Sequence, residues 1–196
     1  MELLELMKHR RSIRKYTAEQ ITREEMEKIL EAGASAPNAG GAQRSMIVGV
    51  RDAKLTRLIG KLNFLPFDRS SLIGGHVSDE QPSVIDDPNI RDGFYGAPAV
   101  VALFGQRDFL FSVADAFCSA ENIVLMATEL GLASCIVSRA EETFVTEEGQ
   151  KLLKAWDVPE NYLCRAFVTL GHIDGDYPHA KIVKAGRVKI IEEETK

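Results

Sequence analysis

The chain has 196 residues, of which 45% are hydrophobic and 27% charged, and its formal net charge at pH 7 is -5. These values suit one compact domain spanning residues 1–196 and exclude a disordered chain. The negative net charge argues against nucleic-acid binding, because phosphate recognition leans on a basic surface.

Apolar periodicity and turn residues divide the chain into helices and strands. In chain order we expect a helix over residues 3–7, a helix from 22 to 34, a strand over 46–50, a helix over 52–62, a strand over 98–104, a helix over 108–130, a strand over 133–137, a helix near 146–156 and a strand over 163–170.

Three helix boundaries have specific sequence support. Thr22 followed by Glu25 is a capping box, in which the two residues satisfy each other's backbone and predict a helix start. Asp52 is expected to cap the next helix. Gly131 stands where a helix end favours a left-handed residue.

The most apolar stretch is residues 109–130, which is long enough to cross a bilayer. It contains Asp115, Glu121, Asn122 and Glu129, each of which is costly in hydrocarbon, so we interpret it as a buried helix. Because this helix is apolar almost all round, it also predicts a homodimer whose interface covers its second side. The N-terminus lacks the features of a signal peptide, so a cytoplasmic location is expected.

The order of helices and strands favours an α+β fold, with a mixed β-sheet wrapped by helices. No GxGxxG motif follows the first strand and no GxxxxGK[ST] motif occurs, which argues against a Rossmann nicotinamide site or a P-loop. The three cysteines are widely spaced and form no CxxC pair, and the four histidines have no metal-ligand spacing. We therefore expect neither a disulfide frame nor a metal site.

Two features before the first strand are candidate ligand contacts. Residues 10–14, Arg-Arg-Ser-Ile-Arg, put three guanidinium groups and a hydroxyl within five residues, a composition suited to phosphate. Residues 35–43 combine a proline with two glycines, which lets backbone groups approach a planar heterocycle. Taken alone, the first is more often a solvated basic surface and the second an ordinary turn.

Two further candidates lie in the second half. Residues 131–136 form a glycine turn followed by small residues, which leaves room for a flat ligand. Residues 181–188 carry cations that could close over the same phosphate as residues 10–14. A helix end before a core strand and a solvated terminus are the alternative interpretations.

The four features together resemble the nitroreductase family of FMN-dependent reductases, and the resemblance covers nearly the whole chain. Members share, in this order, R-R-S-x-R, A-P-S-x-x-N-x-Q-P-W, A-P-x-x-[IV], G-L-G-[ST]-x-W and a closing G-R-V. The matching residues here are Arg10, Arg11, Ser12 and Arg14, then Ala36, Pro37 and Gln43, then Ala97–Val101, then Gly131–Cys135 with Ile136 in the tryptophan place, and finally Gly186-Arg187-Val188.

The resemblance implies an intertwined homodimer with FMN at its interface. It implies that the chemistry takes place on the flavin, with no catalytic side chain, and that NAD(P)H and a small acceptor, a nitro compound or a quinone, use the site in turn. The residues that it assigns to FMN are Arg10, Arg11, Ser12 and Arg187 at the phosphate and ribityl chain, Arg14 as a further cofactor-binding residue, Ser35, Pro37, Asn38, Ala39 and Gln43 from the other subunit, and Ser134, Cys135 and Ile136 along the ring.

Two other functions remain open at this point. A flavoenzyme of the same fold could catalyse reductive dehalogenation or flavin breakdown, and the loop over residues 63–96 would decide between these reactions. A protein without enzymatic activity could use the basic residues 10–14 to bind an anionic ligand as a dimer. Neither of these alternatives involves nucleic acid or a membrane.

Overall fold

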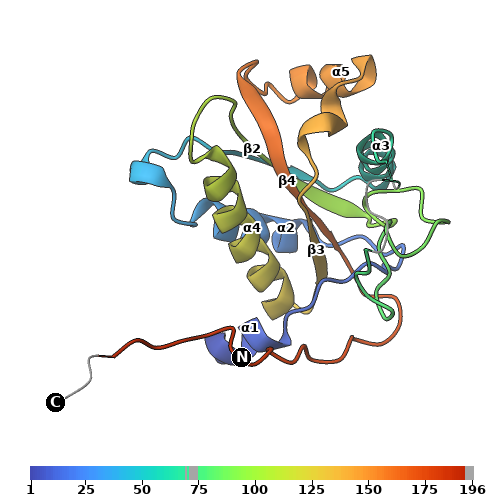
Figure 1. The fold of residues 1–196 in the computed structure, drawn as a ribbon. Coiled ribbons are helices and arrows are strands. Elements are labelled where there is room, and N and C mark those ends of the chain that lie inside the picture. Colours follow the sequence, from blue (N-terminus) through green and yellow to red (C-terminus); the bar gives the residue numbers. More distant parts are fainter. Residues whose placement is uncertain (69, 71–74, 193–196) are drawn as a thin grey trace.

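The computed structural model describes residues 1–68, 70 and 75–192, and Figure 1 shows their arrangement. The helices are α1 (Leu3–His9), α2 (Arg23–Ala34), α3 (Ala53–Phe64), α4 (Ser112–Glu129) and α5 (Glu147–Ala155), with short 3-10 turns η1 (Ala39–Gly41) and η3 (Glu141–Phe144). The strands are β1 (Met46–Val50), β2 (Ala99–Gln106), β3 (Ala133–Val137) and β4 (Tyr162–Gly171).

The predicted helix starts are confirmed. The Thr22 hydroxyl accepts the Glu25 N–H at 3.1 Å, while the Glu25 carboxylate accepts the Thr22 N–H at 2.7 Å. The Asp52 carboxylate caps α3 by accepting two backbone N–H groups, and each such cap is worth about 1 kcal/mol. Gly131 ends α4 with a φ of 74°.

The start of α4 is a correction to the sequence analysis, which expected this helix from residue 108. The helix begins at Ser112, because Phe109 and Phe111 pack their rings edge to face at 5.8 Å in a turn before it. The Ser112 N–H bonds to the Phe109 carbonyl across that turn.

The four strands form one sheet in the order β1-β2-β4-β3, and all three pairings are antiparallel. The α+β class is confirmed, whereas the expected mixed pairing is replaced by a purely antiparallel one. Strands β2 and β3 run in the same direction and are joined through α4, as a crossover requires. They do not pair with each other because β4 lies between them.

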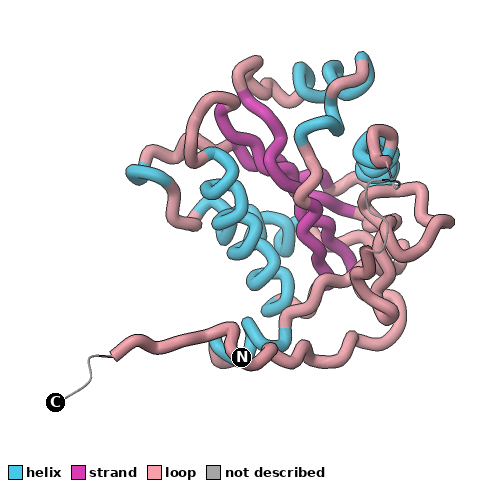
Figure 2. The backbone as a smooth tube through the Cα atoms, in the orientation of Figure 1, coloured by secondary structure: helices cyan, strands magenta, loops and turns pink. Residues whose placement is uncertain are grey.

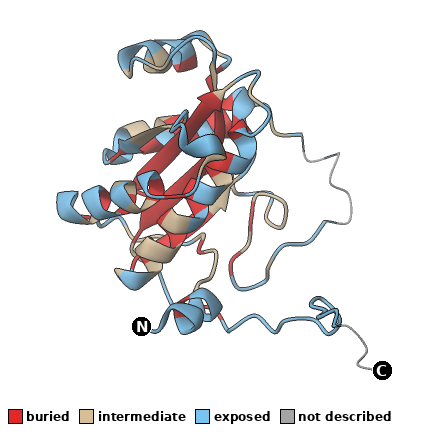
Figure 3. Ribbon diagram, turned by 90° about the vertical axis from the view of Figure 1, so that its left-hand side faces the viewer, coloured by how far each residue is buried: buried red, intermediate tan, exposed pale blue. Residues whose placement is uncertain are grey.

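Helical layers cover both faces of the sheet (Figure 2). Val101 and Val168 belong to the core beneath α2 and α4, while Val100 and Phe167 belong to the core beneath α3 and η3. Phe94, from the segment before β2, packs edge to face on Phe167 at 4.9 Å. Because both faces are covered, the central strands are buried along nearly their whole length (Figure 3).

The C-terminal segment leaves the core after an isolated bridge between Tyr16 and Ile173. It passes α1, and the described residues 181–192 are exposed beyond it (Figure 1). No helix in the described part of the chain is both long and apolar enough to cross a membrane.

Candidate functional site

The arginine segment, residues 10–14, lies against the beginning of β3. The Ile13 N–H donates to the Ser134 carbonyl at 2.9 Å, and the Ile13 side chain is buried. This contact brings Ser12 and Arg14 to the thiol of Cys135, whose pKa is raised by burial and, to a smaller extent, lowered by these two side chains. Two of the four predicted features therefore meet in one place.

Two tyrosines fix the course of the arginine segment. The Tyr16 hydroxyl lies 2.6 Å from the Ile13 carbonyl and 2.7 Å from the Thr169 hydroxyl, and burial raises the pKa of this phenol well above its ordinary value. The Tyr177 hydroxyl accepts the Arg11 N–H at 2.9 Å and donates to the carbonyl of His9, on which its ring stacks.

No sequence motif assigned a function to either tyrosine. Tyr16 follows the arginine segment by two residues, which is a weak local hint. Tyr177 lies 166 residues from its partner Arg11, and no spacing rule connects them.

A cavity of about 260 Å³ lies between the arginine segment, the end of β3 and the chain before β2. Arg14 and Ile136, both predicted site residues, line it together with Tyr95, Ser138 and Arg139. The Arg14 guanidinium lies over the Tyr95 ring at 5.8 Å from its centroid. The walls combine flat apolar surface with positive charge, which suits a planar ligand with an electron-rich edge.

Gln81, a residue that the sequence analysis missed, connects Arg14 to the chain before β2. Its side-chain carbonyl accepts the Arg14 N–H at 2.7 Å, and its backbone carbonyl accepts a hydrogen bond from Arg14 Nη1 at 3.0 Å. Arg14, which lines the cavity, has a buried Nε atom with no hydrogen-bond partner among the described residues. A bound ligand could supply that partner.

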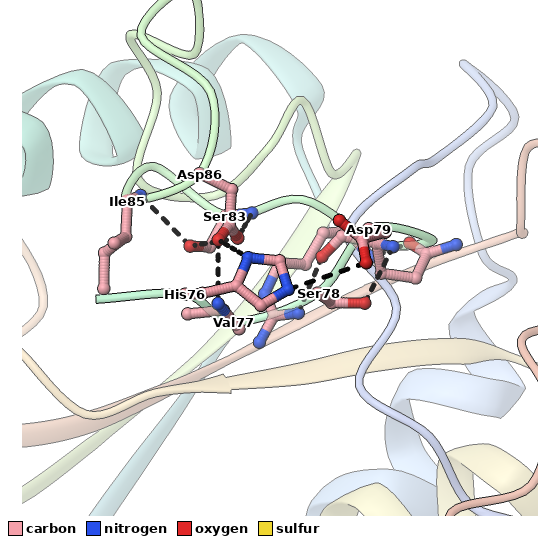
Figure 4. Close-up of polar contacts among 9 residues, drawn as sticks. His76, Val77, Ser78, Asp79, Ser83, Ile85 and Asp86 are labelled. Carbon is pink, nitrogen blue, oxygen red and sulfur yellow. Dashed lines mark hydrogen bonds and ion pairs between the residues drawn. The ribbon is translucent and has the colours of Figure 1, made fainter. Parts of the chain in front are cut away.

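The 76–87 loop, which carries Gln81, is organised around one carboxylate (Figure 4). Asp86 accepts the N–H groups of Val77 at 2.7 Å and Ser83 at 2.8 Å, and His76 Nδ1 lies 3.1 Å from it. Burial acts to raise the pKa of Asp86, but these hydrogen bonds outweigh burial and lower it to about 2. The loop is therefore a fixed wall of the cavity at neutral pH.

The 35–43 loop does not join this cavity within one chain. Its Ala39 N–H donates to the Asp115 carboxylate at 2.9 Å, and Gln43 donates its N–H to the Asn38 side chain at 2.8 Å. Asn38 and Gln43 line a separate cavity of about 410 Å³ beside α2 and β1. Figure 1 draws η1 and the 76–87 loop at opposite edges of the molecule. Ser35 and Pro37 are exposed in the same loop.

The C-terminal tail, residues 181–188, also does not contact the arginine segment in any interaction found among the described residues. Arg187 is exposed, and its N–H makes a local bond to the Lys184 carbonyl. Within the described residues, no group of three His, Cys, Asp or Glu side chains is arranged to hold a metal ion.

The fold and this cavity define a small α+β protein with a positively charged cavity whose walls suit a planar ligand. The chain belongs to the Nitroreductase family, whose sequence model matches residues 7–172. This is a family of oxidoreductases.

Three known proteins illustrate the similarity. A curated protein of Archaeoglobus fulgidus, provisionally named NADH dehydrogenase/NAD(P)H nitroreductase, is 28% identical over 176 residues, which is 87% of this chain and 85% of that protein. The crystal structure of a Bacteroides fragilis nitroreductase with bound FMN has a TM-score of 0.79 and 28% identity, and covers 98% of this chain and 100% of its own. A Desulfitobacterium hafniense nitroreductase with bound FMN shares the fold at a TM-score of 0.78 and 22% identity, covering 98% and 99% of the two chains.

Proposed function

We propose that this protein binds FMN and acts as an NAD(P)H-dependent oxidoreductase on small organic acceptors of the nitro or quinone type. The observation that carries the proposal is the meeting of the arginine segment with residues 134–136 at one cavity. The FMN bound in the Bacteroides fragilis structure, which matches this chain over 98% of its length, supports it further.

The residues present fit FMN in charge and in shape. Arg10, Arg11 and Ser12 offer guanidinium groups and a hydroxyl for a phosphate. The unpartnered Nε of Arg14 offers a hydrogen bond to the polar edge of a ring. Cys135 and Ile136 would lie along the ring. When bound, FMN supplies the two-electron chemistry that connects NAD(P)H to the acceptor.

The remaining predicted residues require a second copy of the chain. Ser35, Pro37, Asn38, Ala39 and Gln43 lie away from the arginine segment of their own chain, as does Arg187. In a homodimer, this loop and this tail would reach the cavity of the partner subunit. Such a dimer would complete two equal sites, as a two-fold interface requires.

An absorption spectrum of the purified protein tests the cofactor directly. We expect flavin bands in the native protein, FMN as the released compound, and bleaching of the bands by NADH or NADPH under anaerobic conditions. A protein without these bands that takes up no FMN on titration would contradict the proposal. It would favour the dimer that binds another anionic ligand.

A further inference from the structure

Arg139 brings a second positive charge to the cavity. It comes from a different part of the sequence than Arg14 and makes different contacts. It follows β3 by two residues, and its guanidinium lies 4.8 Å from the centroid of the Phe67 ring. Among the described residues it forms no contact ion pair with a carboxylate, and Glu142 acts on it electrostatically only from a longer distance. Its charge is therefore available to a ligand, and its stacking on Phe67 holds it at the cavity wall.

A buried amide fixes the position of Arg139. Asn63 donates to the Arg139 carbonyl at 2.6 Å and to the Thr143 hydroxyl at 2.9 Å, and Arg139 Nη2 donates back to the Asn63 carbonyl at 2.5 Å. Gly93 packs so closely on Asn63 that an added Cβ would lie 2.0 Å from its side-chain oxygen. The guanidinium is thus held in one place and loses little freedom on binding.

The rest of the cavity lining contains no negative charge. Phe67 and Tyr95 provide aromatic surface, while Val77, Ile85 and Ile136 provide aliphatic surface. None of the described lining residues is acidic, so Arg14 and Arg139 give the cavity a positive charge. A flat apolar molecule with an anionic substituent would match both the apolar walls and the positive charge.

We propose that Arg139 determines specificity, by selecting planar aromatic acceptors that carry a carboxylate or a similar anionic substituent. This inference rests on the proposed function, because the acceptor has to enter a site that contains FMN. The Arg139 fork would bind the carboxylate, and the aromatic body would lie between the flavin and the 76–87 loop.

The test compares two compounds of one shape and different charge on the FMN-loaded protein. Benzoate and benzamide are titrated while flavin absorbance and the heat of binding are followed. The wild type should bind benzoate about tenfold more tightly, since one charge-assisted hydrogen bond is worth that factor or more. Arg139→Gln should remove the preference, and Arg139→Lys should keep part of it.

Arg57→Gln is the matched control. Arg57 is an exposed cation on α3 that is not part of the lining of this cavity, so its removal changes the net charge equally and should leave the preference intact. The same pattern is expected for the KM values of 4-nitrobenzoate and 4-nitrobenzamide. The kcat with the neutral quinone menadione should stay unchanged in Arg57→Gln.

The outcomes separate the two proposals. A protein that takes up no FMN overturns the proposed function, and this inference with it. An FMN-loaded wild type that reduces neutral acceptors but binds benzoate and benzamide equally overturns the inference alone, even if the Arg139 variants fail to fold. If the defect of Arg139→Gln were confined to flavin reduction by NADPH, the residue would be assigned to nicotinamide binding. That result would also overturn the inference about the acceptor.

Discussion

Sequence motifs mark two pairs of segments in this chain as parts of a ligand site, but the structure brings only one pair together. The arginine segment and β3 meet through the Ile13–Ser134 bond and share a cavity with Arg14 and Ile136. The 35–43 loop and the tail around Arg187 lie elsewhere and stay largely exposed. The contrast supports the proposal that one chain builds half of a site and presents the other half to a second copy.

Exposed apolar side chains favour the same interpretation. On α4, Val113 is 46% exposed and Cys118 is exposed, although this helix is apolar almost all round. In the tail, Ile182 is 90% exposed and Ile190 is 80% exposed. Large apolar side chains that a single chain leaves exposed can belong to an interaction site, and a homodimer would cover them.

The largest effect is expected from mixing two defective variants. Arg10→Ala with Arg14→Ala removes one half-site, and Asn38→Ala with Gln43→Ala removes the other. Loss of two charge-assisted bonds should weaken FMN binding of the first homodimer by about a hundredfold or more. In a mixed dimer, one cavity combines both defects and the other has none, so about half of the wild-type flavin should return.

Coexpression with two affinity tags isolates the mixed dimer, and its flavin content is measured after gel filtration. Light scattering of the wild type at low micromolar concentration should give the dimeric mass. If each cavity were complete within one chain, every site of the mixed dimer would carry a defect. Flavin would then stay as low as in the parent variants.

The next largest effect on FMN binding is expected from removing a single cation. Arg10→Ala and Arg187→Ala should each weaken FMN binding about tenfold or more, because each would lose one charge-assisted contact to the phosphate. Lys189→Ala removes an exposed cation two residues further along the tail and serves as the control. Fluorescence titration of the apoprotein measures the three dissociation constants. Unchanged values for Arg10→Ala and Arg187→Ala would locate the phosphate elsewhere.

Local rules predicted much of the fold and the half-site within one chain. The bounds of β1 and β3 agree with the expected strands 46–50 and 133–137, and the cap at Thr22 starts α2 as expected. These elements depend on neighbouring residues, whose spacing can be read directly. The insertion of β4 between β2 and β3 depends on pairings between distant segments, which leave no local pattern.

The same limit applies to the site. The basic composition of residues 10–14 and the small residues of 131–136 marked two segments that the structure brings together at one cavity. Gln81 and Tyr177 were missed because each contacts the arginine segment from a remote part of the chain, over sequence separations of 67 and 166 residues. Side chains that act through such contacts become recognisable when the fold is known.

A smaller effect is expected at the 76–87 loop, which lines one cavity together with the arginine segment and the end of β3. These three segments form the assembled region of the chain. Asp86→Asn places an amide N–H₂ group against one of the N–H donors of Val77 and Ser83. Leaving such a donor unsatisfied costs about 1–3 kcal/mol, so the free energy of unfolding should fall by that order. Limited proteolysis within residues 76–87 should become faster. The control is Asp79→Asn, whose carboxylate is 95% exposed and lies 3.7 Å from His76.

Lowering the pH should destabilise the wild type in the same way as Asp86→Asn, because acid protonates the Asp86 carboxylate. The pKa of Asp86 in the folded protein, about 2, lies below its ordinary value of 3.8. The carboxylate therefore stabilises the fold fully above about pH 4, and this stabilisation is lost as the pH falls toward 2. The Asp86→Asn variant should lack this part of the acid transition. If wild type and variant lose stability in parallel between pH 4 and pH 2, the carboxylate does not organise the loop.

The smallest effect is expected at Cys135, although this residue lies at the centre of the assembled region. Burial is the main influence on its thiol and raises the pKa, so the nucleophilic and redox-active thiolate is scarce at neutral pH. The Sγ atom lies 3.6 Å from the Ile136 carbonyl, and none of the three described cysteines forms a disulfide. A dithiol relay would need a second thiol beside it, and the sequence has no CxxC pair.

Replacing Cys135 by Ala or Ser should therefore leave flavin reduction by NAD(P)H intact and change turnover only modestly. Stopped-flow absorbance under anaerobic conditions separates the two half-reactions, with Cys164→Ala as a control for the loss of a buried thiol on the neighbouring strand β4. If Cys135→Ala keeps its FMN but no longer passes electrons to any acceptor, the thiol takes part in the reaction. The assembled region would then contribute chemistry of its own as well as the binding surface proposed for it.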